Sequence, residues 1–481
     1  MQHRQPSLVT KLFYGFGSVA FGVKDNGFAF FLLLYYNQVL GLPASWVGFG
    51  IMLALMIDAF LDPIIGYVSD HLKTRWGRRH PFMYFSALPV AASYFLLWDP
   101  PKGLSPESLF VYLLVVAVVV RAMISLYEIP SASLVAELTD DYDQRTAILS
   151  YRYFFGWTGG LTLSIFAYSF LLQPDAEHAV GVLNVNGYRI YGVVSSVVMA
   201  LAILTSALGT HSYIPYLRQP SERPHGFTGT VREVFSTLSN RSFIALFCAG
   251  ISLAMAAGLM ASLSIYFNTY FWELSSGQIS MLVMANFISA IGAVAISPVV
   301  TTRYGKKAGA VRIALILLLT GPLPVILRLF DWFPANGSTV LMPLLLLSNT
   351  LSVMLIIVFS VLVSSMVADV VEDSEISTGR RSEGMFFAVN SFVQKSVSGI
   401  GIFVSTLLLR AIDFPADAKP GAVDPEVIRS LGLVYVPLLG VLIVIVIGFL
   451  SSYRITRAGH TDNLRRLAER RASVAEAIES K

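Results

Sequence analysis

Eight ionisable side chains stand well inside long apolar segments of this 481-residue sequence, away from the segment ends. A charge at the centre of a membrane-spanning helix costs about 2.5–3.5 kcal/mol on insertion scales, so such residues must meet one another or water. Seven of the eight lie in the first half of the chain, where four carboxylates face three bases. The surplus negative charge predicts a place for a cation. The eight residues are Lys24, Asp25, Asp58, Asp62, Arg121, Glu128, Arg152 and Lys395.

Asp58 and Asp62 are four positions apart, so on a helix they project from one face about one turn from each other. Two carboxylates this close in a low dielectric repel, and one takes up a proton unless a cation lies between them. The pair therefore indicates a cation site. The alternative is that arginines of neighbouring spans pair with the two carboxylates only to hold the bundle, and the following Pro63 also suits a bent packing helix.

Two bases complete this pattern. Arg121 lies seven residues before Glu128, on roughly the same helix face, so we expect it to support Glu128 within one helix. Lys395 stands near the middle of an apolar segment, with Ser391 before it and small residues such as Gly399 after it, which permits close helix approach. Our hypothesis is that Lys395 and a cation compete for the same carboxylates.

The composition excludes several classes of protein. The chain is 55% hydrophobic and 13% charged, whereas soluble proteins average about 45–50% apolar and 25% charged residues. Its 34 basic and 30 acidic residues give a net charge of only +4, which argues against nucleic-acid binding. The single cysteine, Cys248, excludes a disulfide framework. The seven histidines fall in loops or termini and no hydrolase or metalloprotease motif occurs, so we expect no enzyme.

A window of about 20 apolar residues identifies membrane-spanning helices. The chain offers twelve candidates, separated by short polar or Gly/Pro-marked breaks. The basic start runs into the first of them without a cleavage-site pattern, so we expect no removable signal peptide. The predicted spans are 12–40, 46–68, 82–98, 109–137, 147–172, 189–210, 243–271, 279–301, 310–330, 339–368, 384–409 and 431–452.

The distribution of Lys and Arg predicts the orientation, because cytoplasmic loops carry the excess of positive charge. With a cytoplasmic N-terminus, the outward loops hold only Lys102, Lys419 and Arg429, and both termini are inside. A long Pro- and Arg-rich connection separates two sets of six spans. The predicted organisation is a six-helix bundle at 1–210, a cytoplasmic loop at 211–241, a second bundle at 242–452 and a basic cytoplasmic tail at 453–481.

Two internal matches indicate a duplication. Residues 133–141 match 365–373, and residues 75–79 match 303–307 at nearly the same offset. Two parallel halves are the layout of major-facilitator carriers, whose substrate sites lie near the midplane of the membrane between the repeats.

Residues 66–70 (GYVSD) followed by 75–79 (RWGRR), together with 58–63 (DAFLDP), resemble the signatures of the glycoside–pentoside–hexuronide:cation symporters, the melibiose-permease-like group of the major facilitator superfamily. Further similarity at Lys24, Glu128, Arg152 and Lys395 extends the resemblance over essentially the whole chain. It implies an all-α integral membrane protein with the major-facilitator fold, in which twelve transmembrane helices form two six-helix bundles related by a pseudo-two-fold repeat.

The resemblance also implies a cation site. In the family the two carboxylates that match Asp58 and Asp62 bind sodium, proton or lithium, helped by an intervening polar residue and a hydroxyl that matches Ser125. Leu61 stands here in place of the polar residue. A hard cation prefers several oxygen ligands, so the proton competes with Na+ as the coupling ion.

For the substrate, the resemblance points to Asp25, Glu128 and Arg152, with Lys395, Lys24 and Ser391 as further contacts. Carboxylates accept hydrogen bonds from sugar hydroxyls, and a guanidinium donates in a planar fork. Ala132 replaces an aromatic residue of the melibiose type and Leu55 replaces an arginine. Both changes open apolar space and keep a lysophospholipid as an alternative substrate.

Charged residues at the inward ends of the spans have a separate predicted task. They could form ion pairs that latch the two bundles together on the cytoplasmic side, although a plain positive-inside signal explains the arginines equally well. These residues are Asp70, Arg75, Arg78, Arg79, Glu137 and Asp369.

Together these features predict a cation-coupled symporter that moves a small glycoside-like solute by alternating access. The alternatives are a Na+-dependent lysophospholipid carrier and a non-transporting sensor on a carrier scaffold. We expect no tightly bound cofactor, a coupling ion that is Na+ or H+, and no nucleic-acid partner. We also expect a monomer in the plasma or inner membrane.

Overall fold

The computed structural model describes residues 6–72, 74–139, 142–176, 178–216, 241–378, 383–415 and 418–453. Within these ranges, the side chains at 70–71, 136, 142–143, 145–147, 241–243, 367–378, 383–394 and 396 lie outside the description. The predicted site residues Asp70, Asp369 and Ser391 are therefore outside the described side chains, as are most of the predicted central loop and nearly all of the tail.

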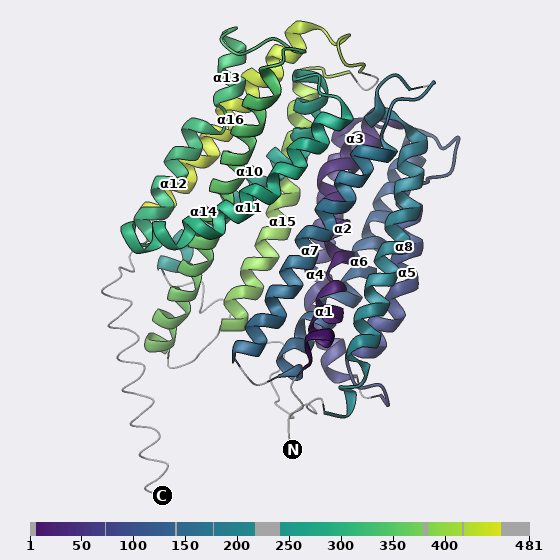
Figure 1. The fold of residues 1–481 in the computed structure, drawn as a ribbon, viewed down its shortest axis with the longest axis vertical. Coiled ribbons are helices and arrows are strands. Elements are labelled where there is room, and N and C mark those ends of the chain that lie inside the picture. Colours follow the sequence, from purple (N-terminus) through teal and green to yellow (C-terminus); the bar gives the residue numbers. More distant parts are fainter. Residues whose placement is uncertain are drawn as a thin grey trace, which may run out of the picture. The chain divides into compact units, whose positions relative to one another are not determined.

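Every regular element in these described ranges is helical (Figure 1). The first span is broken into short pieces: α1 (Leu8–Phe16), α2 (Val19–Asn26), α3 (Leu32–Leu34), and the π-helical turns η1 (Gly27–Phe31) and η2 (Tyr35–Val39). The rest of the first half holds α4 (Ala44–His71), α5 (His80–Trp98), α6 (Pro106–Leu138), α7 (Tyr142–Phe166), η3 (Ala167–Leu171), η4 (Gly181–Leu183), α8 (Val185–His211) and η5 (Ile214–Tyr216). The second half holds α10 (Arg241–Tyr266), η6 (Phe267–Phe271), α11 (Ser276–Tyr304), α12 (Lys306–Thr320), α13 (Leu323–Leu329), α14 (Leu341–Thr378), α15 (Glu383–Ala411) and α16 (Pro425–Ser451).

These helices match the predicted spans. In the described part of the chain, 11 segments are long and apolar enough to cross a membrane, from Leu8–Val39 to Pro425–Ser451. The remaining predicted span, 384–409, coincides with α15, whose described apolar part is Val397–Ala411. The predicted all-α membrane architecture is confirmed.

Local sequence signals set several helix starts. Ser7 caps α1 by accepting from the Thr10 N–H, and Ser105 caps α6 by accepting from the Ser108 N–H. Asn184 caps α8 through the N–H groups of residues 186 and 187. Each of these side chains satisfies an N–H that the first helical turn would leave unpaired.

Contacts between residues divide the chain into two compact units. The first comprises the described residues of Met1–Glu222, Gly258–Met284 and Ser398–Leu431, and the second comprises those of Arg223–Ala257, Ala285–Val397 and Gly432–Lys481. The predicted boundaries of the two six-helix bundles stay a prediction.

In the first unit, α5 packs on α6 and α8, α4 packs on α6, and α7 packs on α1 and α2 (Figure 1). A buried aromatic cluster joins the first span to α5 and α8. Phe31 and Tyr35 contact Trp98, whose ring stacks on Tyr188 with centroids 5.9 Å apart. The Tyr35 hydroxyl donates to the Trp98 carbonyl at 3.0 Å, so this aromatic contact is also anchored by a hydrogen bond.

The contact between α2 and α7 is backbone against backbone. A Cβ atom built on Gly22 would lie 1.8 Å from the carbonyl oxygen of Gly156, and one built on Gly160 would lie 2.4 Å from the carbonyl oxygen of Gly22. Small residues at helix contacts permit this close approach in membranes. Near this contact, the Arg152 guanidinium of α7 lies 5.0 Å from the centre of the Phe21 ring of α2.

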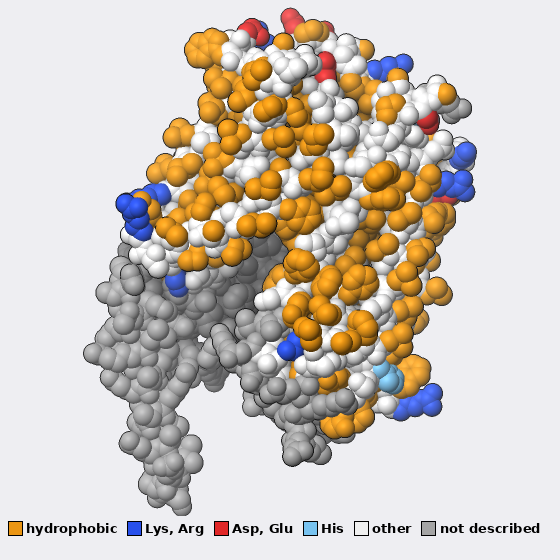
Figure 2. All heavy atoms as spheres, viewed as in Figure 1, with side chains coloured by type: hydrophobic (Ala, Val, Ile, Leu, Met, Phe, Trp, Pro, Cys, Tyr) orange, Lys and Arg blue, Asp and Glu red, His pale blue; other side chains and the backbone are white. Residues whose placement is uncertain are grey.

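The second unit has its own apolar core, built from α10, α11, α12, α14 and α16. Val358, Phe359 and Leu362 of α14 lie at its centre, packed with Ile313 of α12 and Leu450 of α16. On the face shown in Figure 2, apolar side chains cover the helix flanks and most charged side chains lie near the helix ends. Exposed residues such as Leu88, Ile291 and Val294 match a surface in contact with lipid.

Candidate substrate and ion site

The two carboxylates of α4 share one hydroxyl from α6. The Ser125 Oγ lies 2.9 Å from Asp58 Oδ1 and 2.8 Å from Asp62 Oδ1. Asp58 is fully buried, whereas Asp62 is half-buried. The four-residue spacing on α4 thus places both carboxylates against the same hydroxyl of α6. Their role as a cation site stays a prediction.

A guanidinium completes the surroundings of Asp58. Arg121 Nε and Nη2 both donate to Asp58 Oδ2, at 3.1 and 2.9 Å, and the Arg121 side chain is itself buried. The guanidinium lies 5.3 Å from the centre of the Phe28 ring. The expectation that Arg121 supports Glu128 within α6 is therefore wrong, because the arginine reaches across to α4 instead.

A second charged group joins α2 to α6. Lys24 Nζ lies 2.9 Å from Asp25 Oδ1 and 3.8 Å from Glu128 Oε2. The Lys24 side chain is 3% exposed, whereas the Asp25 and Glu128 side chains are 58% and 23% exposed. One buried ammonium therefore lies between two carboxylates and neutralises only part of their charge, and the Asp25 side chain is the more exposed of the two.

Arg152 of α7 is positioned by neutral groups. Its Nη1 donates to the Ser131 Oγ at 2.9 Å and to the Tyr14 Oη at 3.3 Å, and its Nη2 donates to the Glu128 carbonyl oxygen at 3.3 Å. Its guanidinium lies 5.0 Å from the centre of the Phe21 ring. Arg152 thus joins α1, α6 and α7 beside the acid at position 128. Nothing in the sequence singles out Tyr14 and Ser131 for this role, because neutral hydroxyl residues are common in such spans.

Of the other predicted site residues, Lys395 lies on α15 in the second unit and is half-buried. Its proposed relation to the carboxylates of the first unit stays a prediction. At the predicted inward end of the first unit, Arg78 Nη2 and Arg79 Nε approach Glu137 Oε1 to 2.7 and 3.0 Å. Arg75 lies 5.4 Å from the ring centre of its neighbour Trp76. Arg78, Arg79 and Glu137, three of the predicted latch residues, therefore pair with one another within the first unit.

At the opposite end of the first unit, Asn37 and Gln38 hydrogen-bond to two tyrosines and a backbone carbonyl. We call this set of hydrogen bonds the Asn37–Gln38 lock; no motif in the sequence pointed to it. The Tyr266 hydroxyl donates to Asn37 Oδ1 at 2.7 Å, and the Tyr270 hydroxyl donates to Gln38 Oε1 at 3.1 Å. Gln38 Nε2 also donates to the Pro415 carbonyl oxygen at 3.0 Å. The four-residue spacing of the two tyrosines on one helix face is the signal that could have revealed the lock.

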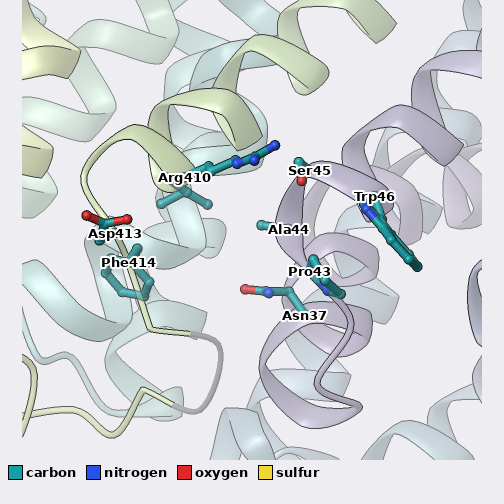
Figure 3. A pocket seen from close by; sticks show the side chains of 9 residues that line it. Asn37, Pro43, Ala44, Ser45, Trp46, Arg410, Asp413 and Phe414 are labelled. Carbon is teal, nitrogen blue, oxygen red and sulfur yellow. The ribbon is translucent and has the colours of Figure 1, made fainter. Parts of the chain in front are cut away.

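Beside the lock lies a pocket of about 480 Å³ (Figure 3). One side is formed by η2 and the start of α4, and the other by the end of α15 and the turn after it. The side chains of Asn37 and Arg410 extend toward the space between these segments. The pocket is lined by Asn37, Pro43, Ala44, Ser45, Trp46, Leu409, Arg410, Asp413 and Phe414.

Replacing Tyr266 by phenylalanine removes one donor from the lock. Because a net hydrogen bond contributes about 0.5–1.5 kcal/mol, we expect the open form of this end to become about 2- to 10-fold more populated. The measurement is the rate of maleimide labelling of a cysteine placed at Ser262 in a Cys248→Ser background. Ser262 is buried and lies one helical turn before Tyr266 on α10. The control is Tyr112→Phe, whose hydroxyl donates to the Leu96 carbonyl at 2.7 Å, away from the lock. Equal labelling rates would show that the lock does not hold this end closed.

Comparisons with known proteins agree with this architecture. The family model described as MFS/sugar transport protein matches residues 13–457. The chain is 26% identical to the glucuronide carrier protein homolog of Escherichia coli (strain K12), over 89% of this chain and 88% of that protein. It is 24% identical to the sodium-dependent lysophosphatidylcholine symporter 1 of Mus musculus, over 89% of this chain and 81% of that protein.

A solved structure of the xylose transporter XylE from E. coli, in a partially occluded inward open conformation, matches the fold with a TM-score of 0.61. The match has 16% sequence identity and covers 93% of this chain and 99% of that one. The resemblance first read from residues 58–79 is therefore confirmed over nearly the whole length. The chain belongs to the MFS/sugar transport protein family and is a membrane transporter with the major-facilitator fold, not an enzyme.

Proposed function

We propose that this protein moves a small glycoside-like solute across the membrane together with a cation, by alternating access. The observation that carries the proposal is the group formed by Lys24, Asp25, Glu128 and Arg152. An exposed carboxylate within a membrane span, such as Asp25, is stable only where it faces water or polar ligands. Such a group is suited to a polyhydroxylated solute that arrives through a wet cavity.

The chemistry of the group fits sugar hydroxyls. The carboxylates of Asp25 and Glu128 are acceptors, and hydrogen bonds to charged groups are stronger than those to neutral ones. Lys24 neutralises part of their charge, so the carboxylates remain together without a bound cation. Arg152 donates to the backbone carbonyl oxygen of Glu128 and so places a guanidinium beside that residue.

The similarity to a carrier whose name specifies glucuronide supports a glycoside or uronide as the solute. The similarity to a lysophosphatidylcholine symporter keeps a lysophospholipid as the second candidate. The exposed Ala132, four residues after Glu128, leaves the space beside that acid without an aromatic side chain. A longer apolar ligand could use this space.

A thermal-shift screen of the purified protein against sugars, uronides and lysophospholipids separates these candidates. We expect a glycoside or uronide to raise the melting temperature and a lysophospholipid to leave it unchanged. In Glu128→Gln the stabilising solute should bind at least about 10-fold more weakly, because a charge-assisted hydrogen bond contributes about 1.5–3 kcal/mol.

The control for this screen is Asp99→Asn, which removes a carboxylate that pairs with Arg189 outside the group, with Nε and Oδ2 3.2 Å apart. This variant should bind the solute like the parent protein. Stabilisation by lysophospholipids alone would replace the glycoside assignment with the lipid one, and no response to any solute would contradict the proposed function.

Lys395 is the base that we propose to compete with the coupling cation. Replacing it by glutamine should abolish accumulation of the solute against its gradient, because cation entry would no longer release a bound lysine. The measurement is uptake of labelled solute into proteoliposomes under an inward cation gradient. Lys102→Gln, a change in an exposed loop, is the matched control. Undiminished accumulation by Lys395→Gln would reject the competition.

A further inference from the structure

The surroundings of Asp58 contain a positive charge that belongs to the chain itself. Both donors of the Arg121 fork, Nε and Nη2, point to the same oxygen of Asp58, at 3.1 and 2.9 Å. The other oxygen of Asp58 accepts from the Ser125 hydroxyl at 2.9 Å. The single proton of that hydroxyl is shared with Asp62 Oδ1, which lies 2.8 Å from the same Oγ. The constant partner of the acid that the family resemblance assigns to a coupling cation is therefore Arg121.

The oxygen ligands around Asp58 fit a sodium ion poorly. A hard cation needs several oxygen ligands at short range, and Leu61, between the two acids, supplies none. The Asp58 oxygen that faces Arg121 could bind sodium only if the ion stood beside a guanidinium. Two positive charges this close in a low dielectric repel each other strongly.

The surroundings of Arg121 also hold its guanidinium in place. Its side chain is 4% exposed, so it is largely shielded from water. Its guanidinium lies against the Phe28 ring, an arrangement that stabilises a cation over an aromatic face. An arginine stays charged at any physiological pH and holds a carboxylate in a planar fork, unlike an exchangeable ion.

We propose that Arg121 takes the position of a coupling sodium ion at Asp58, so that solute binding and transport by this protein do not depend on sodium. The inference rests on the transport function proposed above and narrows the ion that can accompany the solute. It assigns a role to a residue that matches no motif of the family resemblance. In its independence from sodium, this chain would differ from the mouse sodium-dependent lysophosphatidylcholine symporter 1.

Sodium itself is the probe that tests the inference. The melting temperature of the purified full-length protein is measured in NaCl and in choline chloride at about 100 mM, a concentration at which a site of millimolar affinity is nearly filled. The parent protein should melt at the same temperature in both salts. Arg121→Gln should melt at a lower temperature than the parent in choline chloride and gain at least about 3 °C in NaCl, in a saturable manner.

Further variants test whether the sodium ion binds at Asp58. Arg121→Gln combined with Asp58→Asn should lose the sodium response, and Arg121→Ala combined with Leu61→Asn should strengthen it by returning an oxygen ligand. Arg189→Gln, which removes an arginine that pairs with Asp99 elsewhere, is the matched control and should show no response.

A saturable, sodium-specific stabilisation of the parent protein overturns the inference, whether or not any variant folds. So does a folded Arg121→Gln protein, judged by its circular dichroism and elution, that ignores sodium. Failure of the proposed function has a different signature, since it appears as the absence of any response to solutes in the screen described above.

Discussion

Replacing Asp58 by asparagine should lower the free energy of unfolding by about 3–5 kcal/mol, because it leaves the Arg121 guanidinium buried without its charge partner. The side chains of Asp58 and Arg121 are 1% and 4% exposed, and the atoms Nη2 and Oδ2 are 2.9 Å apart. An asparagine can accept one hydrogen bond from the fork but cannot balance its charge. The measurement is unfolding by SDS in mixed micelles, followed by circular dichroism.

Two controls separate the loss of a charge from the loss of packing. The double variant Asp58→Leu with Arg121→Met removes both charges and should be close to the parent in stability, since a buried pair is often replaceable by apolar side chains of similar volume. Asp62→Asn should cost less than Asp58→Asn, because Asp62 is only half-buried. A loss below about 1 kcal/mol in Asp58→Asn would contradict the view that Arg121 depends on this carboxylate.

Replacing Gly22 by alanine should destabilise the first unit by about 3 kcal/mol and abolish solute binding. The new Cβ would lie 1.8 Å from the Gly156 carbonyl oxygen, which is backbone and cannot rotate away. Helices α2 and α7 would have to separate. This separation would displace Lys24, two residues along α2, from its contact with Glu128.

Gly50→Ala on α4 is the matched control for this packing effect. The nearest atom to its built Cβ is Phe110 Cε2 at 3.6 Å, an ordinary van der Waals contact. Alanine also has a higher helix propensity than glycine, so this variant should be at least as stable as the parent. Unfolding curves and the thermal-shift response to the solute are measured for both variants. Equal behaviour of Gly22→Ala and Gly50→Ala would show that α2 and α7 do not need the close approach.

Much of the fold could be predicted from the sequence because each membrane span carries its own signal. A helix that crosses a bilayer must be apolar over about 20 residues whatever it packs against, and the observed segments, such as Ala44–Ser69 and Val185–His211, follow the predicted ones closely. The first span was less predictable in detail. The π-helical turns η1 and η2 interrupt the α-helix of this span, and no periodicity in the sequence indicates them.

The sequence could identify the residues of the candidate site but not which base pairs with which acid. A charge in an apolar span is visible locally, which is why Asp58, Glu128 and Arg152 could be named from the sequence. The shared position of Asp58 and Asp62 also followed from helix geometry alone, because both lie on α4. The partner of Arg121 did not follow, since its nearest acid on the same helix face, Glu128, was the simpler choice.

The helical membrane architecture and the charges inside the spans follow from the amino-acid sequence, because the cost of placing a residue in lipid depends on that residue and its near neighbours. Which base meets which acid depends instead on how the helices pack. Lys24 reaches Glu128, and Arg121 reaches Asp58. Both pairings depend on how closely helices distant in sequence approach and how each is rotated. That approach is set by packing contacts, such as Gly22 against Gly156, that no single helix contains.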